Sequence, residues 1–129
     1  SKVSPVFFFL FAILMILRYF MAAERITPNV LYAAIVIYLL IGVTGAVVYS
    51  LVELLAPGSF SLTDPNLQNG EYVFIYYSFV TLTTLGYGDI VLTGNWRTLA
   101  AIQAANGVII FGWTTALIFY FIQQIYKEK

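Results

Sequence analysis

The stretch Thr83-Thr84-Leu85-Gly86-Tyr87-Gly88-Asp89 lies between long apolar segments and places a glycine on each side of an aromatic residue. Glycine adopts positive φ freely, whereas the left-handed conformation costs any other L-residue roughly 1–2 kcal/mol. Alternation of the two glycines with Leu85 and Tyr87 therefore predicts a backbone whose successive carbonyl oxygens point to the same side. Such a file of oxygens, with the Thr84 hydroxyl beneath it, carries no net charge and suits a desolvated monovalent cation better than a divalent one. One chain supplies only one wall of a passage, so the stretch predicts several copies around an axis.

The composition is that of a membrane protein. Of 129 residues, 61% are hydrophobic and 9% are charged, against roughly 45–50% and 25% in soluble domains. Six basic and six acidic residues cancel, which argues against nucleic acid as a partner. The chain contains no cysteine and no histidine, which removes thiolate metal sites and the commonest general base and metal ligand. We therefore expect no enzyme activity and no cofactor.

The first apolar run extends from Val6 to Ala23, about 18 residues and near the lower limit for crossing a bilayer. Ser4-Pro5 has the N-cap and first-turn residues of a helix start. We expect residues 1–26 to form a membrane-spanning or interfacial helix and a linker, with Arg18 extending to an interface. A signal peptide is an alternative, but Phe20 and Met21 fit a cleavage site badly. A voltage sensor needs several arginines on one helix, and one does not suffice.

Residues 27–129 are predicted to form one pore domain. Thr27-Pro28 begins a long apolar run that predicts an outer helix over about 28–56. Two glycines inside this run, Gly42 and Gly45, indicate close packing against a neighbouring helix. The polar residues 57–69 contain turn sequences and predict an exposed turret.

The segment 70–83 is apolar and aromatic but too short to span a bilayer, which predicts a re-entrant helix buried in protein. Glu71 near its start complements the positive end of a helix, and the end near Thr83 directs partial negative charge toward the following loop. After the loop at 84–89, residues 95–126 predict a long inner helix. The predicted fold is therefore an all-α membrane protein with one extra helix before the pore domain.

The sequence Thr84-Leu85-Gly86-Tyr87-Gly88-Asp89 resembles the signature of potassium channels. The resemblance covers about residues 30–126, as the outer helix, pore helix, filter and inner helix of the tetrameric two-transmembrane-helix pore family of prokaryotic type. It implies a homotetramer around a central pore, so that the partners of each chain are three identical subunits, membrane lipid and potassium ions. It also implies that K+ binds the carbonyl oxygens of Thr84, Leu85, Gly86 and Tyr87 and the Thr84 hydroxyl, with Gly88 completing the filter.

The resemblance further implies residues that support the filter. Asp89 would brace the outer mouth against aromatic residues of the pore helix, where Tyr76 and Tyr77 stand, although plain core packing explains these tyrosines too. Thr83 precedes the filter directly. Glu53 matches an acidic position that supports the loop after the filter in some family members, and an interfacial carboxylate without a special partner is the alternative. Leu85 and Val80 depart from the residues more common in the family, and the second departure removes a glutamate-dependent inactivation.

On the inner helix, Gly107 falls where many relatives place a gating hinge, and Gly112 follows as a second glycine. Helix packing explains either glycine as well as hinging does. By the resemblance and helical spacing, further residues would line the cavity or approach a lower constriction. These candidates are Val108, Phe111, Thr115, Ala116 and Tyr120.

These features together predict a potassium-selective channel in the cell membrane that crosses it several times. The basic residues support an orientation in which Arg18, Arg25, Lys127 and Lys129 lie inside and Lys2 and Arg97 lie outside. A weakly selective cation channel is the nearest alternative. A non-conducting membrane anchor or regulatory subunit is another, but it has no use for glycines in a buried loop.

Overall fold

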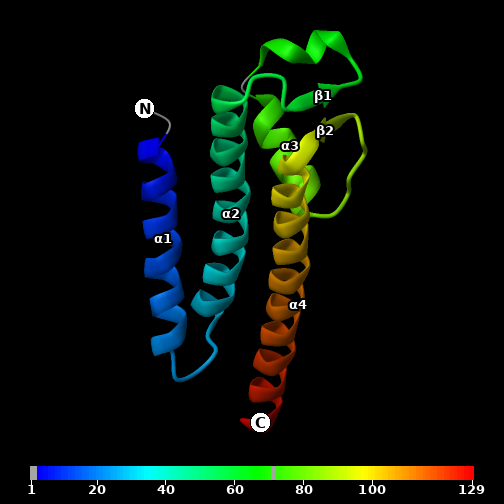
Figure 1. Cartoon of the computed structure of the whole chain (residues 1–129). Coiled ribbons are helices and arrows are strands. Elements are labelled where there is room, and N and C mark those ends of the chain that lie inside the picture. The colour runs from blue at the N-terminus through cyan, green and yellow to red at the C-terminus, as the bar shows by residue number, and fades with distance from the viewer. Residues whose placement is uncertain (1–2, 71) are drawn as a thin grey trace.

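The structure is a computed structural model that describes residues 3–70 and 72–129. Within these residues the chain forms four α-helices and one small ribbon of two strands (Figure 1). In chain order the elements are α1 (Val3–Ala22), α2 (Pro28–Leu55), β1 (Phe60–Leu62), the 3-10 helix η1 (Pro65–Asn69), α3 (Tyr72–Leu82), β2 (Ile90–Leu92), the 3-10 helix η2 (Gly94–Trp96) and α4 (Arg97–Lys127). Three of the helices, α1, α2 and α4, are long and apolar enough to cross a membrane, and α3 is not. The predicted all-α membrane fold is confirmed.

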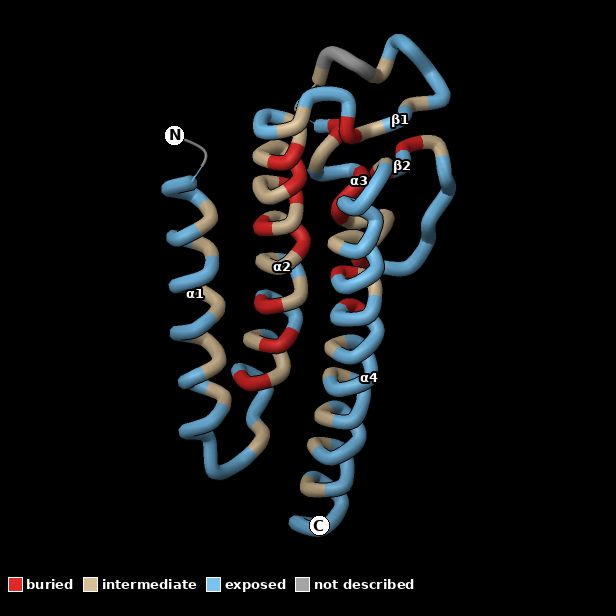
Figure 2. Tube along the Cα trace, viewed as in Figure 1, coloured by how far each residue is buried: buried red, intermediate tan, exposed pale blue. Residues whose placement is uncertain are grey.

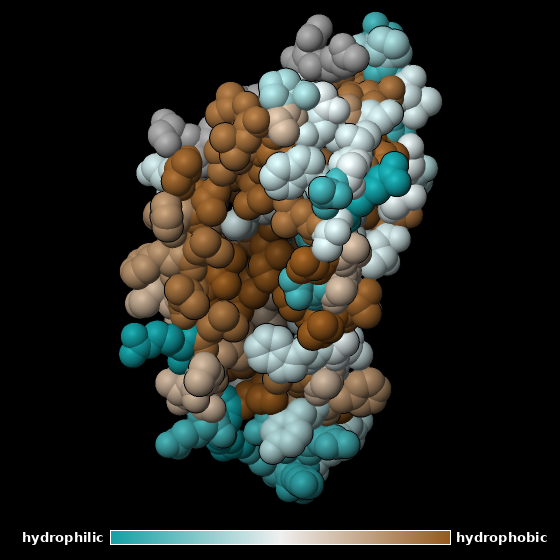
Figure 3. Space-filling model, viewed as in Figure 1, coloured by the Kyte–Doolittle hydropathy of each residue, from teal (hydrophilic) through white to brown (hydrophobic). Residues whose placement is uncertain are grey.

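The three long helices lie side by side and alternate in direction, and α3 and the ribbon gather at one end of the bundle (Figure 1). The linker between α1 and α2 and the end of α4 lie together at the other end, where Arg25 forms an ion pair with Glu128. Side chains along the middle of the visible face are largely apolar, and hydrophilic ones collect toward that second end (Figure 3). Arg25 and Lys127 thus lie at the same end, as the predicted orientation requires, while Lys2 falls outside the described residues.

The two helix starts predicted from a cap residue followed by proline have different outcomes. Thr27 is the N-cap of α2, where its side-chain oxygen accepts a hydrogen bond from the Val30 amide at 3.4 Å and Pro28 occupies the first turn. Helix α1, however, begins at Val3, so Ser4 lies inside the first turn and not at the predicted N-cap position. Pro5 is tolerated there because the first-turn amides have no partner within the helix.

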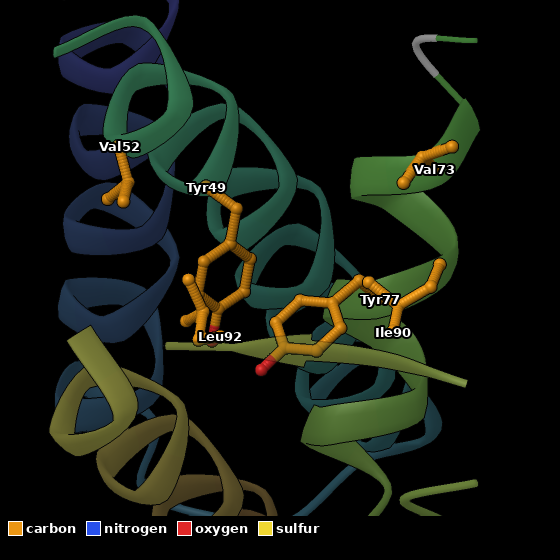
Figure 4. Close-up of a cluster of buried hydrophobic side chains, with 6 residues drawn as sticks. All are labelled: Tyr49, Val52, Val73, Tyr77, Ile90 and Leu92. Carbon is orange, nitrogen blue, oxygen red and sulfur yellow. The ribbon is translucent and has the colours of Figure 1, made fainter. Parts of the chain in front are cut away.

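One cluster of buried hydrophobic side chains lies at the end of the bundle that carries α3, and further buried residues follow α2 toward its other end (Figure 2). The cluster joins three elements, as Figure 4 shows, through Tyr49 and Val52 of α2, Val73 and Tyr77 of α3, and Ile90 and Leu92 of β2. The rings of Tyr49 and Tyr77 meet edge to face with centroids 4.9 Å apart, an arrangement that stabilises aromatic pairs beyond the area they bury. Helix α3 is therefore held in protein, as its length predicted. Glu71, predicted to lie near its start, falls outside the described residues.

The ribbon ties the polar segment after α2 to the residues that follow the loop at 84–89. Strands β1 and β2 pair antiparallel, with Phe60 opposite Leu92 and Leu62 opposite Ile90. These strands were not predicted from the sequence, because three residues are too few for an alternating pattern to be recognised.

Candidate ion-conduction site

The backbone between α3 and β2 alternates in the sign of φ. Thr84, Gly86 and Gly88 have φ of +61°, +54° and +80°, and Thr84 is the only described non-glycine residue with positive φ. Leu85 and Tyr87 between them keep ordinary negative φ. This is the alternation predicted from the two glycines, extended by one residue at Thr84. A threonine in this conformation costs about 1–2 kcal/mol, and strain of this kind collects at functional sites.

Two hydrogen bonds hold the start of this segment on the end of α3. The Thr84 amide donates to the Thr81 carbonyl at 3.0 Å, and the Gly86 amide donates to the Val80 carbonyl at 3.2 Å. The Thr83 hydroxyl donates to the Phe79 carbonyl at 2.7 Å, so it bonds back onto α3 and not onto the filter. The position of α3 therefore decides where residues 84–88 begin.

The carbonyl oxygens of this segment accept no hydrogen bond from the residues that the structure describes. Among the described residues, none donates a hydrogen bond to the carbonyl oxygen of Thr84, Leu85, Gly86 or Tyr87. All four residues are exposed in the single chain, on the side of the molecule away from α1 and α2 (Figure 1). Unpaired backbone oxygens at membrane depth are tolerated only where they line a cavity or are buried in protein. The segment thus offers neutral oxygen ligands, and the described residues contain no group of three or more acidic side chains that could hold a metal ion.

Asp89 fastens the far end of the segment. Its carboxylate accepts a hydrogen bond from the Tyr76 hydroxyl at 2.7 Å and one from the Ile90 amide at 3.0 Å. Its carbonyl oxygen accepts from the amide and the hydroxyl of Thr63, at 2.9 and 3.1 Å. The hydrogen bond to the Asp89 carboxylate raises the pKa of the Tyr76 hydroxyl above its ordinary value, because ionisation would remove the donated proton. The structure therefore brings together Asp89 and Tyr76, the pair that the resemblance implied.

Tyr77 does not take part in this bracing. It is buried in the core, where its ring meets those of Tyr49 and Phe60 edge to face. Among the described residues no hydrogen bond joins Tyr77 to Asp89, and its place in the single chain is that of the core-packing alternative. One residue along a helix rotates the side chain by about 100°, so two adjacent tyrosines cannot both face the same carboxylate.

Glu53 holds a different loop from the one expected. Its carboxylate accepts hydrogen bonds from the amides of Gly58 and Ser59, at 2.9 and 3.2 Å, and so closes the turn at the end of α2. The Ser59 carbonyl in turn accepts from the amide and hydroxyl of Thr93, at 2.8 and 3.0 Å. Glu53 therefore reaches the loop after the filter only through Ser59. The reason is distance along the chain, since a turn five residues away offers free amides first.

On α4, Gly107 is buried against the end of α3. A Cβ atom at this position would overlap with the carbonyl oxygen of Leu82 and lie 2.9 Å from its carbonyl carbon. Of the two explanations given for Gly107, close packing is the one the structure displays. A Cβ atom at Gly112 would meet nothing within 4 Å. The other predicted cavity and gate residues are all exposed in the single chain, namely Val108, Phe111, Gly112, Thr115, Ala116 and Tyr120.

A family model described as "Ion channel" matches residues 26–124, about three quarters of the chain. The protein belongs to this ion channel family. The match covers α2, α3 and nearly all of α4 and leaves α1 outside, as the resemblance noted from the sequence did. No curated protein and no solved structure was found to match the chain.

Three supports of residues 89–93 were not anticipated from the sequence. Thr63 binds the Asp89 carbonyl, and Ser59 and Thr93 join the turret to the segment after β2. The Arg97 side chain also donates to the Leu92 carbonyl at 3.2 Å. Polar residues in a turret and beside a strand of three residues carry no local pattern that distinguishes such pairing from exposure to solvent.

Proposed function

We propose that the chain forms a potassium-selective channel of the cell membrane, in which four identical subunits surround a central pore and K+ passes passively through a filter made by residues 84–88. The observation that carries the proposal is the alternation of positive and negative φ from Thr84 to Gly88, together with four backbone oxygens that have no donor among the described residues. Residues 27–129 would form the pore domain and residues 1–26 an accessory helix and linker.

The chemistry of the ligands favours a monovalent cation. The filter segment contains no charged side chain, and the neighbouring Asp89 carboxylate is already engaged by Tyr76 and Ile90. Divalent cations prefer sites with carboxylates, whereas rings of carbonyl oxygens replace the hydration shell of K+. The carbonyl end of α3 lies next to the segment and adds partial negative charge.

A ring of copies follows from what one chain leaves uncovered. Its carbonyl oxygens and the exposed residues of α4 lie at its surface, where a lipid-facing position would leave the oxygens unpaired. Closed cyclic symmetry places the same segment of each copy around one axis. A purified species with the protein mass of a monomer or dimer would contradict the proposed tetramer.

The test is ion flux into liposomes that contain the purified protein, comparing K+, Rb+ and Na+, for the parent and for Gly88→Ala. Alanine at φ +80° strains each of the four filters, so we expect lost flux or lost selectivity with membrane insertion intact. Gly58→Ala is the matched control, because Gly58 has φ +85° and also has open space for a Cβ atom, but it lies in the turret. We expect this control to keep the parental selectivity.

The outcomes separate the alternatives. Normal potassium selectivity in Gly88→Ala would overturn the assignment of the filter. Equal permeability of Na+ and K+ in the parent would favour a weakly selective cation channel. An assembled parent protein without any flux would favour a membrane anchor or regulatory subunit.

A further inference from the structure

A buried chain of hydrogen bonds connects the three helices of the pore domain within the membrane. The Tyr49 hydroxyl of α2 donates to Gln103 Oε1 of α4 at 2.5 Å, and Gln103 Nε2 donates to the Ser78 hydroxyl of α3 at 2.8 Å. The Ser78 hydroxyl donates in turn to the Gly42 carbonyl of α2 at 2.6 Å. All three side chains are buried, with exposed fractions of 1%, 9% and 0% for Tyr49, Gln103 and Ser78.

Gln103 links α2 to α3 in this series of hydrogen bonds, because its side-chain amide accepts from Tyr49 and donates to Ser78. A carboxamide accepts a hydrogen bond at its oxygen and donates one at its nitrogen, so it can bond to two neighbouring helices at once. Within the described residues, no buried side-chain oxygen or nitrogen lacks a partner. In hydrocarbon, where water cannot replace a lost partner, removal of Gln103 would leave the groups on both sides unpaired.

Close backbone packing surrounds Gln103. A Cβ atom at Gly45 of α2 would overlap with both Gln103 Nε2 and Ser78 Oγ. A Cβ atom at Gly42 would overlap with the Phe79 ring of α3. One turn further along α4, Gly107 lies against the Leu82 carbonyl at the end of α3. Small residues therefore bring the helices to the distance at which the hydrogen bonds form, and the hydrogen bonds hold α3 at one depth between α2 and α4.

The depth of α3 is transmitted to the filter over a short path. Ser78 lies one turn before Leu82 on α3. Of the residues between them, Val80 accepts a hydrogen bond from the Gly86 amide at its carbonyl, and Thr81 accepts one from the Thr84 amide. A shift of α3 along its axis would move these two acceptors and so displace the first of the carbonyl oxygens of residues 84–87.

We infer that Gln103 is a positioning residue for the filter. It bonds to α2 and α3 at once, and so sets the depth of α3 and the place where the carbonyl oxygens of residues 84–88 lie in each subunit. The inference rests on the proposed function, because it takes those oxygens as the ion-binding groups. Gln103 itself touches no ion.

The test compares Gln103→Leu with Thr114→Val in assembled protein. Leucine approximates the volume of glutamine without its donor and acceptor. Thr114→Val also removes a polar group from α4, a partly buried hydroxyl, but this hydroxyl bonds within its own helix, to the Ile110 carbonyl at 2.8 Å. From reversal potentials in mixed K+ and Na+, we expect a severalfold rise in relative Na+ permeability for Gln103→Leu and none for Thr114→Val. An unchanged ratio in assembled Gln103→Leu, or an equal rise in Thr114→Val, would overturn the inference.

Two further variants keep the test decisive if Gln103→Leu does not assemble. Ser78→Ala removes the link between Gln103 and α3, and we expect it to raise Na+ permeability as well. Tyr49→Phe leaves that link in place, and we expect a smaller rise. Tyr49→Phe with an effect equal to or above that of Ser78→Ala would contradict the proposed path through α3.

A spectroscopic readout separates this inference from the proposed function. The chain has no cysteine, so a single spin label at Val91→Cys, an exposed position of β2 just beyond the filter, can report distances between subunits. We expect the Gln103→Leu background to broaden or shift this distance distribution and the Thr114→Val background to leave it unchanged. If Gln103→Leu shifts the distances but the parent protein proves unselective, the positioning role is retained and only potassium selectivity is refuted. If the Gln103→Leu and Thr114→Val backgrounds give identical distance distributions, the positioning role is overturned.

Discussion

The two ends of α4 are held very differently. Near the filter, α4 packs on α2 and α3 through Gln103 and Gly107, beside the buried core (Figure 2). Beyond Gly107, no residue of α4 is buried in the single chain. The connections of this half to the N-terminal part include a ring contact of Phe20 with Trp113 at 5.1 Å, a hydrogen bond from Gln124 to the Ile26 carbonyl at 3.4 Å, and the ion pair of Arg25 with Glu128.

The difference matches two physical demands on a channel. The proposed selectivity requires carbonyl oxygens at fixed positions, and the dense packing around α3 would hold them there. Elements that move are drawn from regions with few buried apolar contacts and low local stability. The half of α4 beyond Gly107 is such a region within one chain. In the proposed tetramer, the other subunits would provide its remaining packing contacts.

The largest effect is expected for Gly107→Ala, compared with Gly112→Ala on the same helix. The added methyl group at Gly107 would overlap with the Leu82 carbonyl, which is backbone and cannot rotate away. Overpacking of this kind costs typically about 1–3 kcal/mol. Alanine at Gly112, where no atom of the chain lies within 4 Å, should leave stability unchanged or raise it by up to about 1 kcal/mol through helix propensity. Thermal unfolding of the detergent-solubilised proteins measures both; equal losses would show that the two halves of α4 are packed alike.

A smaller effect is expected for Glu53→Ala, compared with Asp64→Ala. Glu53 accepts two amide hydrogen bonds that close the turn before β1, and through Ser59 this turn supports the residues after the filter. Hydrogen bonds to charged groups contribute roughly 1.5–3 kcal/mol to stability. Because the Glu53 carboxylate is partly exposed, we expect the stability lost in Glu53→Ala to lie at the lower end of this range. Asp64 also caps an amide, that of Asn66 at 2.9 Å, but in an exposed 3-10 turn.

Amide hydrogen exchange at Gly58, Ser59 and Thr93 measures the difference. We expect all three amides to exchange faster in Glu53→Ala and to keep the parental rates in Asp64→Ala. Unchanged exchange at Thr93 in Glu53→Ala would show that the turret turn and the segment after the filter are independent.

The smallest effect is expected for Arg25→Glu, in the linker between α1 and α2 at the end of the bundle away from α3. Both side chains of the pair with Glu128 are largely exposed, at 65% and 59%. Exposed ion pairs are typically worth about 0.2–1 kcal/mol and weaken with salt. Hydrogen exchange of the last turn of α4 at low salt should therefore accelerate slightly in Arg25→Glu and return to the parental rate in Arg25→Glu/Glu128→Arg. Failure of the charge swap to restore the rate would show that the pair does not hold this end.

The features that depend on neighbouring residues could be predicted from the order of the amino acids. The lengths of the apolar runs identified three possible spans and one segment too short to span, because a bilayer sets a minimum length. Gly86 and Gly88 predicted positive φ because only glycine adopts it freely. The Thr27-Pro28 start of α2 followed from helix capping.

Contacts between groups far apart in the chain could not be predicted, because they depend on how the helices pack. Tyr76, and not the adjacent Tyr77, reaches Asp89; Glu53 closes its own turn; and Gln103 lies where its amide can join α2 to α3. The positive φ of Thr84 and the packing of Gly107 on Leu82 are likewise consequences of how α3 sits between its neighbours. Local patterns are set by the chain's own geometry over a few residues, whereas these contacts depend on the relative rotation and depth of helices that lie tens of residues apart in the sequence.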